Sequence, residues 1–377
     1  MFYFFKNKDE DKRALLRKAN SLYVAKKYNK AIRIYENILK NDSEDFAAIA
    51  NMATAYFELK KFDKSIPFFL KVIIMDSANP WWYNYLSQSM QKCGDLMGAL
   101  ENAWQAVLLG ENDNVHHLNL AYTIYEIFDE NGQEKIDLIL KKWYEKYPQN
   151  PIAEQCFKSY FSDKNFSRSN LKYVEELFDV FASDFDDVLS ELNYDSPKII
   201  AKYLQENYLL KNDKKISVLD LGCGSGLCGK YIKKTFKKSQ ITGVDISAQM
   251  LKVAEEKKVY DLLIKSDITN CFDGENISFD VVVASDVLTY FGDLNSVFKK
   301  VASLVCKNGV FIFTISENKI NENDYFLMPS SRFVHSQKYV ENMIKKYAYI
   351  VIKNERKILR KEGDKDIVGQ VYLIKKI

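Results

Sequence analysis

Small residues recur at a fixed interval along the first part of the chain. Two series of them keep a spacing of 34 residues: Ala19, Ala53, Ser87 and Ala121, and then Ala31, Ser65 and Ala99. Larger apolar residues follow these positions at helical spacing, so each unit is expected to form two amphipathic helices. Small side chains let the helix backbones approach, and large ones fill the gaps between them. The pattern predicts an all-α helical solenoid over residues 1–150.

Two adjacent tryptophans in this region, Trp81 and Trp82, need a separate explanation. Neighbouring residues of a helix point in different directions, so both cannot face the same core. We expect one of them to be exposed and available for binding. The other aromatic residues of the repeats, such as Tyr35 and Phe69, are expected to be core residues.

The 34-residue register ends near residue 150, where the sequence changes character. Pro148 and Pro151 are followed by a polar run at 163–170, so residues 151–170 are expected to be a linker. The next segment, 174–192, is amphipathic without the repeat. Ser196 and Pro197 then open a further helix, with serine as its cap and proline in its first turn.

From residue 216 onward, short apolar runs alternate with helix-length segments. The runs are 216–221, 241–244, 262–264, 281–284 and 310–315. This alternation predicts an α/β Rossmann-like, doubly wound parallel sheet. Two last runs, 349–359 and 368–374, flank a turn-like segment at 361–364 and are expected to add a terminal antiparallel strand pair, giving seven strands.

Composition narrows the possible partners. The chain has 54 Lys and Arg against 51 Asp and Glu, a formal net charge of +3, which gives no support for binding nucleic acid by bulk electrostatics. Six cysteines without a C-x-x-C pair and three histidines do not form a metal-ligand spacing, so no metal is expected. The apolar segment at 1–5 is too short for a signal sequence, and no membrane span is apparent. We therefore expect a cytoplasmic location.

One segment carries a chemical signal: an apolar strand that runs into Gly222, Gly224 and Gly226 before a helix. Glycines allow a sharp turn and close approach of a ligand, and the helix start offers free amide groups. The spacing differs from the G-x-G-x-x-G of dinucleotide sites, so the loop is not built around a pyrophosphate. Asp245 ends the next strand, 19 residues after Gly226, where a carboxylate accepts hydrogen bonds from ribose hydroxyls. Asp267 ends the third strand.

Together these features resemble the class I S-adenosylmethionine-dependent methyltransferases over about residues 175–377. The 34-residue array in front resembles the tetratricopeptide repeat over roughly residues 12–150. The first resemblance implies that the three glycines pack against the methionine part of S-adenosylmethionine, that Asp245 holds the ribose, and that Asp267 contacts adenine. It also implies a set of further cofactor-binding positions: Asp220, Cys223, Ile246, Met250, Ile268 and Ser285. The domains expected are thus repeats at 1–150, linker at 151–170 and methyltransferase at 171–377.

A finer resemblance rests on the segments 177–179, 181–186, 285–290 and 332–336. With the repeats in front, they look like the bacterial predicted methyltransferases that carry tetratricopeptide repeats. In related enzymes a helix ahead of the sheet covers the cofactor, which implies that Phe185 closes the site here. The alternative is that Phe181 and Phe185 form one helical face packed on the sheet.

The acceptor side of the site is less clearly marked. The fourth strand leads into Asp286 without the Asn/Asp-Pro-Pro-aromatic signature of many nitrogen methylating enzymes, and no Pro-Cys pair is present for attack on a pyrimidine ring. Asp286, Tyr290 and His335 are the candidates for a catalytic base. His335 is also compatible with a satisfied surface or capping role.

Three functions are compatible with these features. The first is a methyltransferase whose repeats recruit or recognise a protein or carrier-bound substrate. The second is a non-catalytic interaction module that only binds the cofactor. The third is a small-molecule O-methyltransferase that does not need the repeats for turnover.

Overall fold

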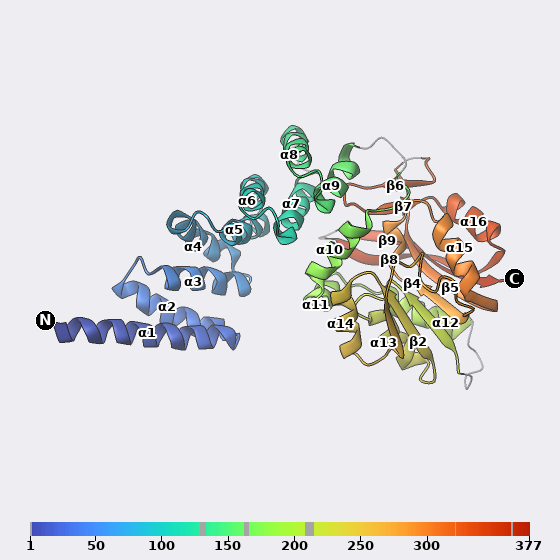
Figure 1. The fold of residues 1–377 in the computed structure, drawn as a ribbon, viewed down its shortest axis with the longest axis horizontal. Helices are drawn as coiled ribbons and strands as arrows, with labels where there is room; N and C mark the ends of the chain where they lie inside the picture. The colour runs from blue at the N-terminus through green and yellow to red at the C-terminus, as the bar shows by residue number, and fades with distance from the viewer. Residues whose placement is uncertain (1, 129–132, 162–165, 208–214, 321, 363–364) are drawn as a thin grey trace. The chain divides into compact units, whose positions relative to one another are not determined.

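The structure is a computed structural model that describes residues 2–128, 133–161, 166–207, 215–320, 322–362 and 365–377. It divides into two compact units, Met1–Tyr147 and Pro148–Ile377 (Figure 1). Each unit has its own hydrophobic core and is described by itself.

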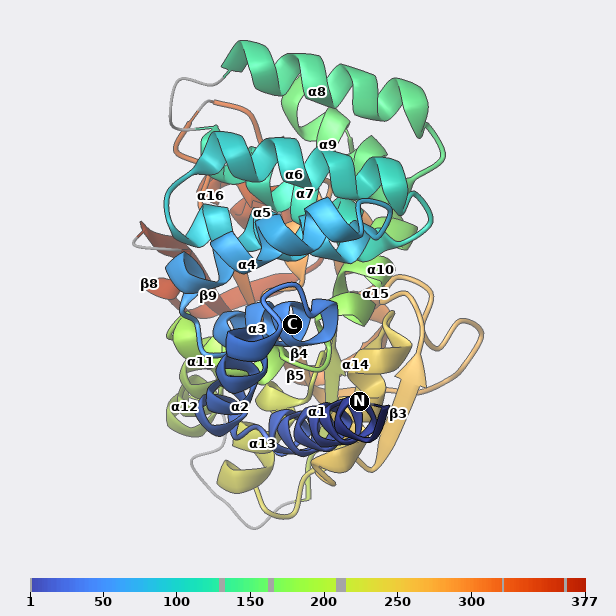
Figure 2. The same cartoon turned by 90° about the vertical axis from the view of Figure 1, so that its left-hand side faces the viewer.

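Unit 1 is an array of antiparallel helices. Each helix packs on the next one, and α1–α3, α3–α5 and α5–α7 also contact each other, which is the arrangement of a solenoid (Figure 2). The helices are α1 (Phe2–Val24), α2 (Tyr28–Asn41), α3 (Phe46–Glu58), α4 (Phe62–Met75), α5 (Pro80–Lys92), α6 (Leu96–Leu109), α7 (Asn114–Ile127) and α8 (Gln133–Lys146). Residues 129–132, between α7 and α8, lie outside the described residues.

The repeated small residues occupy the helix contacts, as the sequence predicts. Six of the seven are fully buried: Ala19, Ala53, Ser87, Ala31, Ser65 and Ala99. The Ser65 hydroxyl donates a hydrogen bond to the Phe62 carbonyl and lies 2.9 Å from the Ser89 hydroxyl. A larger side chain at these positions would separate the helices, so the 34-residue period follows from close packing.

The two tryptophans separate as expected. Trp82 donates its indole N–H to Asp76 at 2.9 Å, whereas Trp81 is 37% exposed and packs edge-on against the ring of His116. Tyr35 and Phe69 are fully buried in the core. The structure therefore confirms the core role of these two rings and leaves Trp81 accessible at the surface.

The segment expected to be a linker contains a helix. Helix α9 (Pro151–Phe161) lies in unit 2 and packs on α10 (Leu171–Phe181). Its start follows ordinary capping: Asn150 accepts the backbone N–H of Ile152, and Pro151 occupies the first turn. The prolines that suggested a linker thus include one that begins a helix.

The remaining helices of unit 2 flank the sheet or precede it. They are α11 (Phe185–Glu191), α12 (Ser196–Asn207), α13 (Leu227–Thr235), α14 (Ala248–Glu256), the short 3-10 helix η1 (Leu288–Tyr290), α15 (Asn295–Leu304) and α16 (Gln337–Lys346). The amphipathic segment 174–192 forms two helices, α10 and α11, which are separated by a turn at 182–184. Phe181 and Phe185 therefore do not share one continuous helical face.

The sheet of unit 2 has the expected parallel strands and terminal antiparallel pair. Its strands are β1 (Ser217–Leu221), β2 (Gln240–Asp245), β3 (Leu262–Lys265), β4 (Phe279–Ala284), β5 (Val305–Ser316), β8 (Tyr349–Glu362) and β9 (Lys365–Lys376). They lie in the order β3-β2-β1-β4-β5-β9-β8, with β9 antiparallel to both neighbours. A separate pair, β6 (Tyr325–Leu327) and β7 (Phe333–His335), was not expected from the sequence.

Alternate residues of the central strands supply two cores. Val282 of β4 faces the same side as Phe298 and Val301 of α15, and Val281 and Val283 face the side covered by α12 and α13. A parallel strand covered on both faces needs apolar residues at every position. This explains the continuous apolar run of β4. Within the described ranges, no helix is both long and apolar enough to cross a lipid bilayer.

Candidate active site

The glycine-rich turn lies between β1 and α13. Gly222 and Gly224 have φ angles of 66° and 52°, in the left-handed region that favours glycine. A Cβ on Gly222 would lie 2.5 Å from a methyl group of Val287, whereas the nearest atom to a Cβ on Gly224 is a ring carbon of Phe185 at 3.7 Å. Gly222 is therefore required for packing, and Gly224 leaves room beside the backbone under Phe185.

We expect Gly222→Ala to destabilise unit 2 by about 1–2 kcal/mol, because the new methyl group must displace Val287 and the backbone is strained. Gly274→Ala is a matched control: its φ is 78°, and nothing lies within 4 Å of an added Cβ. Thermal unfolding midpoints of both variants measure the difference. Equal midpoints would show that the Val287 contact has no effect on stability.

Asp245 links the loop after β1 to the loop after β2. One of its carboxylate oxygens accepts the Gly224 N–H at 2.8 Å, and the other accepts the Ser247 N–H at 2.9 Å. Burial raises the pKa of Asp245 to about 6, against the lowering effect of these hydrogen bonds. The backbone N–H of Ile246 also lowers the pKa. A carboxylate has about four acceptor positions, so these N–H groups still leave capacity for a ligand hydroxyl.

Asp220 lies deeper, on β1, and is fully buried. It accepts a hydrogen bond from the Tyr260 hydroxyl at 2.8 Å, and burial raises its pKa to about 7. Tyr260 also packs against Gly226 and Gly229. These contacts tie β1 to the start of α13 and so hold the glycine turn in shape.

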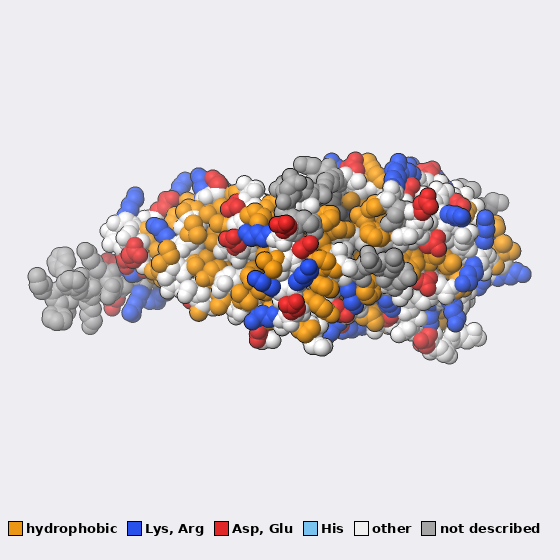
Figure 3. All heavy atoms as spheres, turned by 90° about the horizontal axis from the view of Figure 1, so that it is seen from above, with side chains coloured by type: hydrophobic (Ala, Val, Ile, Leu, Met, Phe, Trp, Pro, Cys, Tyr) orange, Lys and Arg blue, Asp and Glu red, His pale blue; other side chains and the backbone are white. Residues whose placement is uncertain are grey.

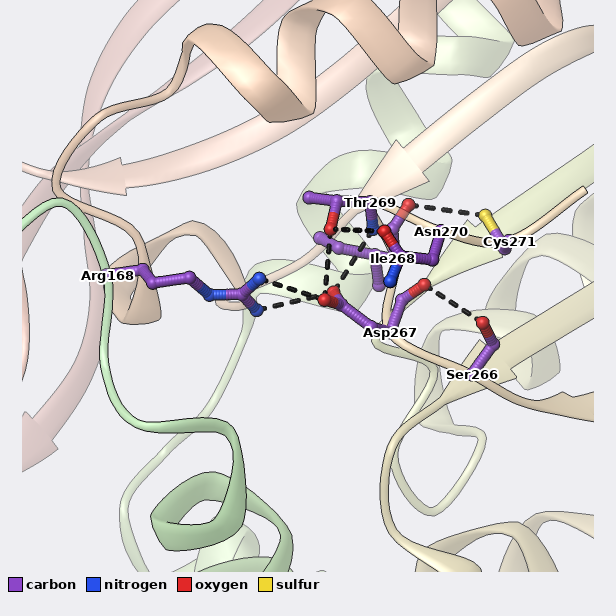
Figure 4. Close-up of polar contacts among 7 residues, drawn as sticks. All are labelled: Arg168, Ser266, Asp267, Ile268, Thr269, Asn270 and Cys271. Carbon is purple, nitrogen blue, oxygen red and sulfur yellow. Dashed lines mark hydrogen bonds and ion pairs between the residues drawn. The ribbon is translucent and has the colours of Figure 1, made fainter. Parts of the chain in front are cut away.

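Asp267 is held by an arginine from far away in the sequence (Figure 4). Its carboxylate accepts hydrogen bonds from Arg168 at 2.8 and 3.3 Å, and from the backbone and hydroxyl of Thr269. Burial acts to raise the pKa of Asp267, but these hydrogen bonds outweigh it and lower the pKa. The Arg168 guanidinium also stacks over the ring of Phe291. The Asp267 carboxylate after β3 is thus held by an ion pair with Arg168 and by hydrogen bonds from Thr269.

The other predicted cofactor residues lie around the same loops. Ser285 follows β4 and shares a hydrogen bond of 2.9 Å with Tyr194. Ile246 is partly exposed after β2. The side chains of Cys223, Met250 and Ile268 are buried.

Of the three candidate bases, Asp286 lies at the end of β4. Its φ is 58°, and its N–H donates to the Thr314 hydroxyl at 2.8 Å. Its carboxylate pairs with Arg360 at 2.8 Å and with Arg332 at 3.6 Å. The structure thus places Asp286 where we expected it but surrounds it with positive charge.

The other two candidates are packed into the protein. Tyr290 is buried in η1 and meets the ring of Phe178 edge-on. His335 is fully buried on β7, where Nε2 lies 2.8 Å from the Phe291 carbonyl and 3.2 Å from that of Gly292. Burial lowers the pKa of His335 to about 4. The polar contacts of His335 are with backbone carbonyls, and those of Asp286 are with arginines and Thr314, so the two do not form one polar cluster.

His335 should make stability depend on pH. Its folded pKa of about 4 lies below the ordinary 6.5, so the unfolded chain binds the extra proton first. The contribution of the neutral His335 ring to the free energy of unfolding is therefore complete above pH 6.5 and is lost as pH falls toward 4. We expect wild type to lose about 2 kcal/mol more between pH 7 and pH 5 than His335→Asn, which has no titrating ring. Denaturant unfolding at both pH values measures this; parallel losses would contradict a buried neutral ring.

The structure adds contacts that no sequence motif revealed. The helices before the sheet are fixed to strand-end loops: Asp179 accepts the Ser247 hydroxyl, and Asp186 accepts the Ser225 hydroxyl and pairs with Lys257 at 2.7 Å. The family resemblance had marked these acids without naming partners. Arg168 lies in a polar run and Arg360 in a basic segment with Arg356, Lys357 and Lys361, and no local signal identifies either arginine as part of the site.

Comparison with known proteins identifies the class of domain that contains these residues. A family model described as a methyltransferase domain matches residues 219–311. A Bacillus subtilis protein named "Putative methyltransferase YqeM" is 30% identical over 183 residues, which is 46% of this chain and 67% of that protein. The chain belongs to the methyltransferase family of this relative. S-adenosylmethionine is the cofactor of this family, and the open glycine turn beside the Asp245 carboxylate fits it.

Other relatives match over shorter stretches. A malonyl-[acyl-carrier protein] O-methyltransferase of Legionella pneumophila is 27% identical over 33% of this chain and 45% of that protein. One from Bacillus cereus is also 27% identical, over 29% and 40%. The chain thus spans less than half the length of these two relatives. A solved methyltransferase from Clostridium acetobutylicum is 20% identical, with a TM-score of 0.39, over 53% of this chain and 99% of that one.

Proposed function

We propose that this protein transfers the methyl group of S-adenosylmethionine to a protein or carrier-bound acceptor. The observation that carries the cofactor part is the hydrogen bond between Gly224 and Asp245, which places an open glycine turn and a carboxylate side by side at the ends of β1 and β2. Open α/β sheets bind ligands at this edge.

Each residue has a distinct part in the proposal. The glycine turn receives the amino-acid end of the cofactor, and Asp245 accepts its ribose hydroxyls. Asp267, held by Arg168, borders the adenine. The bound cofactor supplies an electrophilic methyl group, and the protein contributes mainly orientation and exclusion of water. Phe178 and Phe185, in edge-to-face contact, cover this edge of the sheet.

The helical array is proposed to be a set of tetratricopeptide repeats that binds the acceptor. Its support is the 34-residue period of buried small residues and the apolar side chains that remain exposed on the array, among them Trp81. Figure 3 shows hydrophobic side chains gathered in patches between charged groups on these helices. Exposed apolar patches of this kind mark protein-binding surfaces. The relatives named for an acyl-carrier protein are compatible with a carrier-bound acceptor.

Two alternatives differ from this proposal in one measurable property each. A non-catalytic module would bind the cofactor without transferring its methyl group. A small-molecule O-methyltransferase would keep full turnover without the repeats.

We expect the full chain to bind S-adenosylmethionine and S-adenosylhomocysteine with roughly micromolar dissociation constants, and not NAD. The turn lacks the spacing that accommodates a pyrophosphate. Isothermal titration calorimetry with the three ligands tests this. Binding of NAD in place of S-adenosylhomocysteine would reject the cofactor assignment.

A further inference from the structure

Four hydrogen-bond donors of the protein surround the carboxylate of Asp267, which borders the proposed position of the cofactor's base (Figure 4). One oxygen accepts hydrogen bonds from Arg168 Nη1 at 2.8 Å and from the Thr269 hydroxyl at 2.9 Å. The other accepts them from Arg168 Nη2 at 3.3 Å and from the Thr269 N–H at 3.1 Å. The Thr269 hydroxyl also lies 3.3 Å from an oxygen of Asn270, so its shorter contact is with Asp267. A carboxylate has about four acceptor positions, and the protein supplies a donor to each of them.

The Arg168 guanidinium is held in this position by its own segment of chain. It lies over the ring of Phe291, 4.5 Å from the ring centre. The backbone at Arg168 also forms an antiparallel bridge with that at Phe291. Backbone hydrogen bonds donated by Ser169 and Gly292, at 2.8 and 2.9 Å, flank this bridge. These contacts hold Arg168 beside Asp267 independently of any ligand, because a stacked and paired guanidinium has little freedom to turn away.

The charges of this pair offset each other. Burial acts to raise the pKa of Asp267, but the hydrogen bonds from Arg168 and Thr269 lower it, so the carboxylate is ionised at neutral pH. It is in direct contact with the guanidinium, and the Asp267 side chain is only 11% exposed. An ionised carboxylate has no hydrogen to donate, and its acceptor positions are occupied. An amino group placed beside Asp267 would therefore find neither a free acceptor nor an unpaired negative charge.

We propose that Arg168 determines how the cofactor site recognises the base: it occupies the acceptor positions of Asp267 and so prevents this carboxylate from accepting the amino group of the base. This inference rests on the proposed function and concerns the specificity of the same site. A carboxylate with free positions selects a ligand that has the amino group, because a ligand without it loses a hydrogen bond to a charged acceptor. With Arg168 in place, the site binds the base without this selection.

The test compares two ligands in calorimetric titrations of the full chain. One is S-adenosylhomocysteine. The other is its 6-deamino analogue, in which hydrogen replaces the amino group of the base and the ring nitrogens remain hydrogen-bond acceptors. We expect wild type to bind the two with dissociation constants within about threefold of each other. Arg168→Leu keeps an apolar side chain beside Phe291 but removes the guanidinium from Asp267, so it should bind S-adenosylhomocysteine at least about tenfold more tightly than the analogue.

Lys265→Leu is the matched control. Lys265, at the end of β3, pairs with Glu175 of α10 at 2.7 Å, so this variant also removes an ion pair but leaves the donors to Asp267 in place. It should keep the wild-type ratio of the two affinities. A wild-type preference of about tenfold or more for S-adenosylhomocysteine, which needs no variant to measure, would overturn the inference. An unchanged ratio in a folded Arg168→Leu protein would also overturn it. Failure of wild type to bind either ligand would instead reject the cofactor assignment of the proposed function.

Discussion

We expect Asp245→Ala to weaken binding of S-adenosylhomocysteine by about 1.5–3 kcal/mol, or roughly ten- to a hundredfold. The variant loses the acceptor for the ribose hydroxyls. It also leaves the N–H groups of Gly224 and Ser247 without their carboxylate. The glycine turn would then no longer be held beside the end of β2. Calorimetry at neutral pH, where the group is ionised, measures the change.

Asp261→Ala is the matched control for this prediction. Asp261 also accepts a backbone N–H, from Ile241 at 2.8 Å, but at the opposite ends of the strands. It should cost stability without lowering cofactor affinity. An Asp245→Ala protein that is folded by circular dichroism and binds with wild-type affinity would reject the ribose role.

Deletion of residues 1–147 is expected to lower methyl transfer to the natural acceptor on the order of a hundredfold while leaving cofactor affinity nearly unchanged. The residues proposed to bind the cofactor all belong to unit 2, which has its own core. A repeat surface that binds the acceptor raises its effective concentration at the site, and loss of that surface removes the gain.

The measurement compares radiolabel transfer from S-adenosylmethionine into a lysate by the full and shortened chains. Calorimetric titration of both chains with S-adenosylhomocysteine is the control, because unchanged cofactor affinity shows that unit 2 is folded. Equal transfer would favour the small-molecule alternative. Absence of transfer by either chain, with cofactor bound, would favour the non-catalytic alternative.

Much of the fold could be predicted because its signals are local and periodic. The 34-residue interval of Ala19 and Ala53 is repeated wherever two helices must approach closely. The apolar run of β4 is continuous because both faces of the sheet are covered. The turn at Gly222 and Gly224 could be predicted because glycine is the residue that adopts a positive φ angle most easily. Helix α9 was missed because Pro151 was interpreted as a break, although proline also fits the first turn of a helix.

The electrostatics of the site could not be predicted in the same way. Arg168 and Asp267 are 99 residues apart, and Arg360 and Asp286 are 74 apart. No spacing rule links such pairs, since their contact depends on the path of the chain and on the order of the strands. His335 looked like a candidate base in the sequence, yet it is buried against backbone carbonyls.

The sequence by itself therefore determined the helical array, the alternation of strands and helices, and the edge of the sheet where the proposed cofactor residues lie. Each of these depends on which side of a helix or strand is apolar, and that information is present in every few residues. Only the tertiary structure decided which charges meet. The antiparallel β8–β9 pair returns Arg360 to the end of β4, and the segment before α10 returns Arg168 to the end of β3. Distant side chains gain an interaction only when the whole fold brings them within hydrogen-bond distance.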